Sequence, residues 1–101
     1  MAMTPEGKVK KQCTTLLKQF SAYHFSPVTG GFGKSGVPDI ICCYRGEFLA
    51  IECKAGKNNP TALQEREIKL IRAAGGSTLV IREDNINELQ EWLDARSSSH
   101  G

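Results

Sequence analysis

Hydrophobic and polar positions first alternate with the period of a helix. The apolar residues near the N-terminus form one stripe at helical spacing, namely Val9, Cys13, Leu16, Leu17 and Phe20. Thr4 followed by Pro5 is typical of a helix start, because threonine caps the first turn and proline suits the first helical position. Glu6 lies three residues before Val9 and extends the stripe, which places one carboxylate along the apolar face. Favourable interaction with the helix dipole is one explanation.

The rest of the pattern predicts strands and two more helices. The predicted elements are a short strand at 25–28, strands at 39–44 and 47–54, a helix at 61–76, a strand at 77–82 and a helix at 84–96. Thr61 and Gln64 form a capping-box pattern at the start of the second helix. The last helix is amphipathic, with Ile86, Leu89 and Leu93 on its inward face.

This order predicts an α/β fold in which helices flank a mixed β-sheet. The strand–helix–strand unit from 47–54 to 77–82 predicts a parallel crossover. A chain of 101 residues has room for one core, so we expect a single domain at 1–96 and a flexible tail at 97–101. No apolar run approaches the roughly 20 residues of a membrane span, and no signal-peptide pattern is present, so the expected location is the cytoplasm.

Cysteine spacing and net charge restrict the chemistry only slightly. Cys13, Cys42, Cys43 and Cys53 contain no C-x-x-C pair, and adjacent strand residues point to opposite faces, so buried thiols are favoured over a zinc site. The net charge of +2 is small. Lysines crowd the first twenty residues, but such a run usually forms a solvated helix face.

The glycine-rich stretch GGFGKSG at 30–36 suggests a phosphate-binding loop. In a dinucleotide site the loop opens a helix, whereas here it leads through Val37, Pro38 and Asp39 into a strand. A P-loop needs a glycine at position 28, which is a valine. Both nucleotide-binding patterns therefore fail on context.

The two strands joined by Arg45-Gly46 bring acidic residues together. If these two residues form the hairpin loop, Tyr44 pairs with Glu47 and paired numbers sum to 91, which places Asp39 opposite Glu52. Lys54 points to the same face as Glu52. A three-residue bulged turn would shift the register and separate the acids.

Opposed carboxylates destabilise a sheet unless a cation lies between them. Carboxylates, the backbone carbonyl of Cys53 and water form an oxygen site suited to Mg²⁺ or Mn²⁺. A nearby lysine can orient an attacking water or stabilise charge on a phosphate. The alternative is an incidental Glu-x-Lys on an edge strand with an unrelated aspartate.

Glu6, the GVPD ending at Asp39, the ECK at 52–54 and Gln64 together resemble the PD-(D/E)XK nuclease superfamily, and more narrowly a stand-alone VRR-NUC domain of phages and bacteria. The resemblance runs from Thr4 to about Leu93. It implies a restriction-endonuclease-like core (αβββαβ with a C-terminal helix) and metal-dependent phosphodiester hydrolysis.

The resemblance also implies residue roles. Asp39, Glu52 and the carbonyl of Cys53 correspond to ligands of Mg²⁺ or Mn²⁺, and Lys54 corresponds to the catalytic lysine. Glu6 corresponds to the first-helix acid, which reaches the metal directly or through water, and Gln64 to the glutamine that supports the site. The expected contacts to DNA are Lys8, Lys11, Lys34, Ser35 and Lys57.

The sequence therefore predicts a structure-selective DNA endonuclease, similar to Holliday-junction resolvases, that acts on branched DNA as a homodimer in a bacterial or phage-infected cell. Tyr44, Phe48 and Trp92 are candidate dimer contacts, although core burial is the simpler expectation for each. Two alternatives remain. One is a non-cleaving nucleic-acid-binding module with steep salt dependence. The other is a nucleotide-binding regulator that uses the glycine loop.

Overall fold

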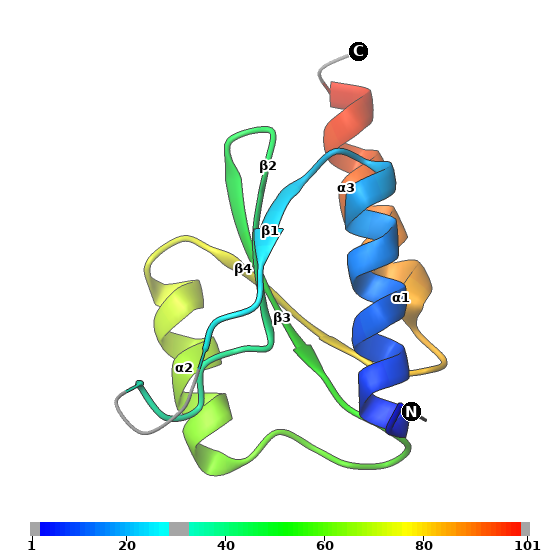
Figure 1. Ribbon diagram of the computed structural model, residues 1–101. Coiled ribbons are helices and arrows are strands. Elements are labelled where there is room, and N and C mark those ends of the chain that lie inside the picture. Colours follow the sequence, from blue (N-terminus) through cyan, green and yellow to red (C-terminus); the bar gives the residue numbers. More distant parts are fainter. Residues whose placement is uncertain (1–2, 29–32, 100–101) are drawn as a thin grey trace.

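The computed structural model describes residues 3–28 and 33–99. They form one four-stranded mixed sheet in the order β1-β2-β3-β4, with three helices packed on it (Figure 1). The elements are α1 (Pro5–Gln19), β1 (Tyr23–Phe25), β2 (Ile40–Tyr44), β3 (Glu47–Cys53), α2 (Ala62–Ala73), β4 (Ser77–Ile81) and α3 (Ile86–Ser99). This arrangement confirms the predicted α/β, restriction-endonuclease-like core. No helix in the described ranges is long and apolar enough to cross a bilayer.

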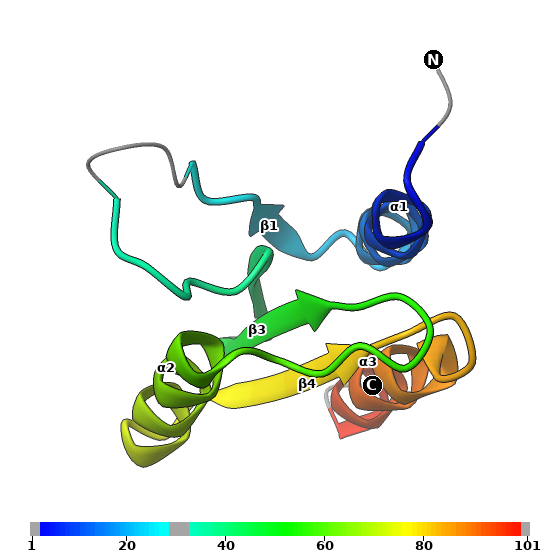
Figure 2. The ribbon, with the colours of Figure 1, turned by 90° about the horizontal axis from the view of Figure 1, so that it is seen from below.

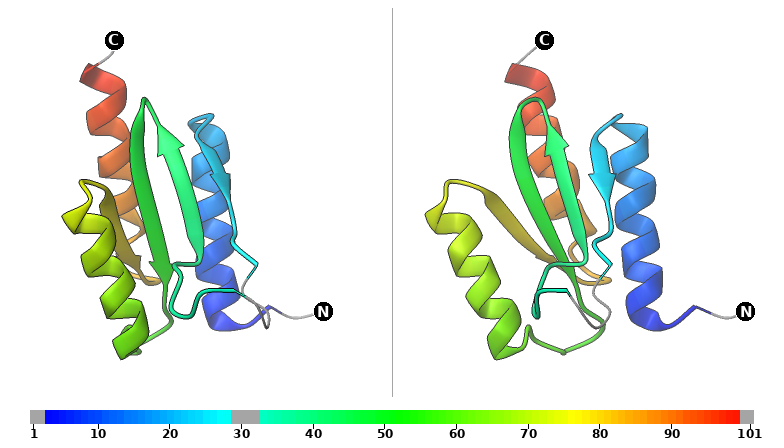
Figure 3. Two further views of the ribbon diagram at one scale, coloured as in Figure 1. Left: turned by 90° about the vertical axis from the view of Figure 1, so that its left-hand side faces the viewer. Right: turned by 60° about the vertical axis from the view of Figure 1, so that its left-hand side comes forward.

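Helices cover the two faces of the sheet unequally. Helices α1 and α3 pack side by side against one face, where the hydrophobic core lies, as Figures 1 and 2 show. Helix α2 lies beside β3 and β4 and contacts β4 through a hydrogen bond from Arg72 to Thr78. Figure 3 shows that β2 and part of β3 have no helix in front of them on this second face. The sheet therefore has one closed face and one partly open face.

The first helix begins where its capping residues predict. The Thr4 hydroxyl accepts a hydrogen bond from the Gly7 backbone N–H at 3.0 Å, and Pro5 is the first helical residue. Val9, Cys13 and Leu17 are fully buried, while Leu16 and Phe20 pack at the edge of the core. The predicted apolar stripe is thus confirmed, and it turns α1 so that Glu6 lies at the edge of the buried face.

The hairpin between β2 and β3 has the predicted two-residue turn. Arg45 and Gly46 have φ values of 54° and 81°, which is the left-handed pair that a tight hairpin turn requires. The cross-strand pairs run from Tyr44 with Glu47 to Ile40 with Ile51, so every pair sums to 91 as predicted. Strands β3 and β4 are parallel, which confirms the predicted crossover through α2.

Strand β1 lies earlier in the chain than predicted. It spans Tyr23–Phe25 rather than 25–28, directly after a turn in which Ser21 has a φ of 58°. Pro27 explains the difference, because proline has no N–H to donate to a sheet ladder. The strand therefore ends before the proline.

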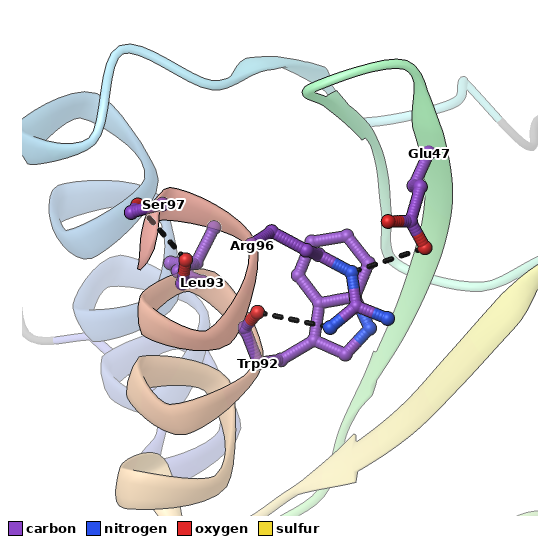
Figure 4. A network of polar contacts seen from close by, with 5 residues as sticks. All are labelled: Glu47, Trp92, Leu93, Arg96 and Ser97. Atoms are coloured by element: carbon purple, nitrogen blue, oxygen red, sulfur yellow. Dashed lines mark hydrogen bonds and ion pairs between the residues drawn. The ribbon is translucent and has the colours of Figure 1, made fainter. Parts of the chain in front are cut away.

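Helix α3 runs three residues further than predicted, into the segment that we expected to be a flexible tail. Ser97 is a helical residue whose hydroxyl bonds to the Leu93 carbonyl and to the Tyr44 hydroxyl. Figure 4 shows Arg96 stacked on the Trp92 indole, with its guanidinium carbon 3.8 Å from the ring centroid, and Arg96 Nε lies 3.2 Å from a Glu47 carboxylate oxygen. These contacts tie the last turn of α3 to the hairpin, so the predicted end of this helix at 96 is corrected to 99.

The cysteines are free and mostly buried, as predicted. Cys13, Cys42 and Cys53 lie in the core, whereas Cys43 is exposed because it points to the open face of the sheet. Within residues 3–28 and 33–99, no group of three or more His, Cys, Asp or Glu side chains is placed to hold a metal ion.

Candidate active site

Two carboxylates meet where β2 begins and β3 ends. Asp39 directly precedes β2 and Glu52 is the second-last residue of β3, one step beyond the pair of Ile40 with Ile51. The Asp39 carboxylate accepts a hydrogen bond from the Cys53 backbone N–H at 2.8 Å, which fixes its position against β3. The predicted opposition of Asp39 and Glu52 is therefore present, and it follows from the two-residue turn at the far end of the hairpin.

Glu52 is buried in a position that disfavours its charged form. Its side chain is 2% exposed, and its Oε2 has no hydrogen-bond donor among the described residues. Burial, together with the adjacent Asp39 carboxylate, raises the pKa of Glu52 to about 9. A proton or a cation must therefore accompany Glu52 in the folded protein at neutral pH.

Gln64 holds the other oxygen of Glu52. Its side-chain N–H donates to Glu52 Oε1 at 3.3 Å, while its side-chain oxygen accepts from the Thr61 backbone N–H at 2.8 Å. The predicted capping box is complete, because the Thr61 hydroxyl also accepts from the Gln64 N–H. The local start signal of α2 thus fixes the direction in which the Gln64 amide points, which is toward the buried carboxylate.

Lys54 and Glu6 approach the same carboxylate from different elements. Lys54 follows β3, is 9% exposed, and its positive charge opposes the rise in the pKa of Glu52. Glu6 comes from the first turn of α1 and adds a weaker negative field that raises the same pKa. The structure therefore gathers the residues Glu6, Asp39, Glu52, Lys54 and Gln64, which the sequence predicted to share one site.

The ligand atoms at this site are oxygens, which suit a divalent cation such as Mg²⁺ or Mn²⁺. The buried Glu52 Oε2 accepts no hydrogen bond from the described residues and faces the Asp39 carboxylate, which is the arrangement that a bound cation would stabilise. The Cys53 carbonyl points to the β2 side, as its N–H does, because the N–H and C=O of one strand residue share a direction. Water or substrate oxygens would complete the coordination of an ion held there.

The Cys53 thiol has no part in such a site. It is fully buried on the core face of β3, where a hydrogen bond with Cys13 and burial raise its pKa. The thiol therefore stays protonated and faces away from the carboxylates. Only the backbone of Cys53 contributes to the site.

The described part of the glycine-rich loop forms one wall of a polar cleft beside Asp39. Gly36 has a φ of 79° and lies so close to α2 that an added Cβ would be 2.5 Å from the Leu63 carbonyl. Lys34 Nζ lies 3.4 Å from the Glu67 carboxylate on the same helix. The loop therefore leads into β2 and rests on α2 without opening a helix, which excludes the dinucleotide-binding geometry. Residues 30–32 of this stretch lie outside the described residues.

This wall and the first helix enclose a cleft of about 370 Å³, which we call the carboxylate cleft. Its lining includes Lys34, Ser35, Asp39 and Gln64, as well as Lys10 of α1. Of the other predicted basic contacts, Lys8, Lys11 and Lys57 are exposed, and Lys11 lines a separate groove between α1 and α3. Lys10 is not among the predicted contacts. It lies four residues after Glu6 and shares its helix face, but only the packing of α1 decides that this face lines the cleft.

Comparison with known proteins agrees with this geometry. The family model of the archaeal Holliday junction resolvase (Hjc) matches residues 25–90. A relative named "Putative nuclease p44", from Acyrthosiphon pisum secondary endosymbiont phage 1, is 24% identical over 90 residues, which cover 88% of this chain and 95% of the relative. These matches support the wider nuclease resemblance, while the narrower VRR-NUC assignment stays a prediction. Because the family match spans well over half of the chain and includes both carboxylates, the chain belongs to the archaeal Holliday junction resolvase (Hjc) family of nucleases, whose substrate is DNA.

Proposed function

We propose that this nuclease is a metal-dependent DNA endonuclease that hydrolyses phosphodiester bonds and prefers branched DNA. The observation that carries the proposal is the buried Oε2 of Glu52, which has no donor among the described residues and faces the carboxylate of Asp39. A fold stabilised only by packing gains nothing from two opposed acids. The pair is useful if a cation is bound there for catalysis.

Each residue of the site has a proposed role that follows from its position. Asp39, Glu52 and the Cys53 carbonyl hold Mg²⁺ or Mn²⁺, with Glu6 contributing directly or through water. When bound, such an ion supplies charge stabilisation at the scissile phosphate and lowers the pKa of water. Lys54 orients the attacking water and stabilises negative charge on the phosphate. Gln64 keeps the Glu52 carboxylate oriented through the bond to Oε1.

The DNA backbone on either side of the cleft is proposed to contact basic and polar side chains. Lys34 and Ser35 lie on the loop wall of the carboxylate cleft, which supports contacts close to the scissile phosphate. The exposed positions of Lys8, Lys11 and Lys57 support more distant contacts. Such contacts position the substrate without reading its sequence, which is consistent with selection by DNA structure.

A homodimer is also proposed, with the open sheet face as its contact surface. Tyr23, Cys43 and Phe48 are direct cross-strand neighbours on β1, β2 and β3, and all three are exposed. We call them the exposed row. The row carries no charged side chain, so it suits a second copy of the chain better than a DNA backbone, which requires cations. Of the predicted dimer contacts, Phe48 lies in this row, while Tyr44 and Trp92 pack against the core.

The test is cleavage of end-labelled DNA in Mg²⁺, Mn²⁺ or EDTA. The panel contains a four-way junction, a flap, a splayed arm, single strand and duplex. The wild type is compared with Asp39→Asn, which keeps a side-chain oxygen for the Cys53 N–H, and with Glu91→Gln on the exposed side of α3 as the charge-matched control. We expect metal-dependent cutting that Asp39→Asn abolishes and Glu91→Gln retains. Cutting that survives Asp39→Asn would refute the proposed site.

The competing function is a nucleic-acid-binding module that does not cleave. It predicts tight binding of the same panel in EDTA, steep salt dependence and no cutting with either metal. Oligomeric state is read separately by light scattering coupled to size-exclusion chromatography, with Phe48→Glu as the variant. A wild-type monomer at the concentrations used for cleavage would refute the dimer without affecting the assignment of the metal site.

A further inference from the structure

The carboxylate cleft contains a lysine whose role the predicted site does not include. Lys10 lies on α1 one turn after Glu6 and lines the cleft together with Asp39 and Gln64. It is half-buried, whereas its neighbours Lys8 and Lys11 are exposed. A half-buried lysine that lines a polar cleft has less freedom to turn into solvent than an exposed one. Because its side chain lines the cleft, its ammonium group can reach an anion bound there.

The rotation of α1 separates Lys10 from Lys11. Val9, Cys13 and Leu17 fix one side of α1 against the sheet, and consecutive residues lie about 100° apart around the helix. Lys11 consequently lines the groove between α1 and α3, on the other side of the helix from the carboxylates. The two adjacent lysines are chemically alike, but they face different surfaces.

The second lysine of the cleft is already paired. Lys34 Nζ lies 3.4 Å from the carboxylate of Glu67, which is only 8% exposed as a residue. This pair ties the loop to α2 and shares the lysine charge with a mostly buried acid. None of the ion pairs found within residues 3–28 and 33–99 includes Lys10. Lys10 is thus the cleft lysine whose charge is available to an anion.

The acids of the site make such a charge necessary. Glu6 and Asp39, and Glu52 once a metal ion replaces its proton, repel the phosphates of an approaching DNA strand, whereas the ion and Lys54 offset this repulsion at the scissile phosphate rather than at its neighbours. A lysine next to Asp39 can bind a non-bridging phosphate oxygen through its ammonium group. A phosphate next to the scissile one would lie within the same cleft, since consecutive phosphates of one strand are separated by a single nucleotide.

We propose that Lys10 binds a DNA phosphate adjacent to the scissile one and so positions the substrate strand over Asp39 and Glu52. This inference rests on the proposed function for its substrate. It assigns Lys10 a larger share of DNA affinity than Lys8 or Lys11. Lys34 acts mainly to hold the loop wall, with its charge shared between Glu67 and the substrate.

The experiment measures binding and cleavage separately. Binding of a fluorescent four-way junction is followed by anisotropy in EDTA from 50 to 300 mM salt, so it does not depend on turnover. The variants are Lys10→Gln, Lys10→Arg, Lys11→Gln and, as the control from the far end of the same helix, Lys18→Gln. We expect Lys10→Gln to weaken binding by about 10- to 100-fold and to reduce the salt slope by about one. Lys10→Arg should retain most of the affinity, and Lys11→Gln should lose less than Lys10→Gln.

Three readouts keep the outcomes distinct. Equal affinity and salt slope for Lys10→Gln and Lys18→Gln would overturn the role of Lys10, whether or not the wild type cleaves. Failure of the wild type to cleave any substrate with either metal would overturn the proposed function instead. Loss of the cooperative urea transition would mean that Lys10→Gln does not fold. The test of Lys10 then rests on Lys10→Arg, because a folded Lys10→Arg that keeps the wild-type salt slope of DNA binding supports a charge contact. A loss of affinity with unchanged salt slope in a folded Lys10→Gln would refute it.

Discussion

Substitution of Glu52 by glutamine should stabilise the protein in metal-free buffer, and the gain should grow with pH. Burial, with the adjacent Asp39 carboxylate, raises the pKa of Glu52 from 4.5 to about 9. Between these values the folded protein carries a proton on Glu52 that the unfolded chain does not. The stability that this proton provides is complete below pH 4.5 and is lost as the pH rises toward 9. Glutamine resembles the protonated acid and has no proton to lose.

The size of the effect follows from this difference in bound protons. One proton held by the folded state and not by the unfolded state changes the unfolding free energy by about 1.4 kcal/mol per pH unit. From pH 6 to pH 8, the stability of Glu52→Gln relative to wild type should therefore rise by about 3 kcal/mol. Comparison of the two proteins cancels the contributions of every other titrating group that the substitution does not touch.

Urea denaturation in EDTA at pH 6, 7 and 8 measures this difference, with Glu91→Gln as the control on an exposed carboxyl. The control should give a difference that does not vary with pH. Addition of Mg²⁺ at pH 8 should stabilise the wild type and leave Glu52→Gln nearly unchanged, since the ion replaces the proton between the carboxylates. A difference between Glu52→Gln and wild type that is constant from pH 6 to pH 8 would show that Glu52 is ionised in the folded protein. That result would refute the reasoning from burial.

Further predictions concern the glycine loop, Gln64 and the open face of the sheet. Gly36→Ala should lower the unfolding free energy by more than about 2 kcal/mol and reduce cleavage, because its Cβ would clash with the Leu63 carbonyl. Gly46 has a similar φ and open space around it, so Gly46→Ala should cost only about 1 kcal/mol of strain. Equal losses of unfolding free energy in urea would contradict the close contact at Gly36. Gln64→Met should lower the unfolding free energy by about 1–2 kcal/mol and also lower kcat/KM, because it removes the side-chain half of the capping box and the bond to Glu52, while the Thr61 cap remains. An unchanged kcat/KM would separate Gln64 from catalysis. In native protein diluted until it is monomeric, one of the four thiols, that of Cys43, should react rapidly with a thiol reagent. Cys43→Ser should remove this rapid reaction, and rapid reaction of a second thiol would contradict the buried positions of the others.

Most of the fold, and the central pair of the site, could be predicted from local rules. A two-residue turn with left-handed backbone angles sets the register of the hairpin, and the alternation of strand side chains then determines that Asp39 meets Glu52. The capping box set both the start of α2 and the direction of Gln64. These features depend on residues close together in the chain or on a register that one turn fixes, so spacing alone was enough.

Other features depend on packing between distant segments, and spacing did not reveal them. Lys10 and Lys11 are chemically alike, and only the seating of α1 on the sheet and on α3 decides that one lines the carboxylate cleft and the other a separate groove. The length of α3 depends on contacts of Ser97 and Arg96 with the hairpin, about fifty residues earlier in the chain. The sequence by itself thus determined which elements form and which carboxylates oppose each other, since short-range geometry controls both. The tertiary structure decided how deeply Glu52 is buried and which lysine of α1 lines the carboxylate cleft, because burial and helix rotation are set by side chains that are distant in sequence.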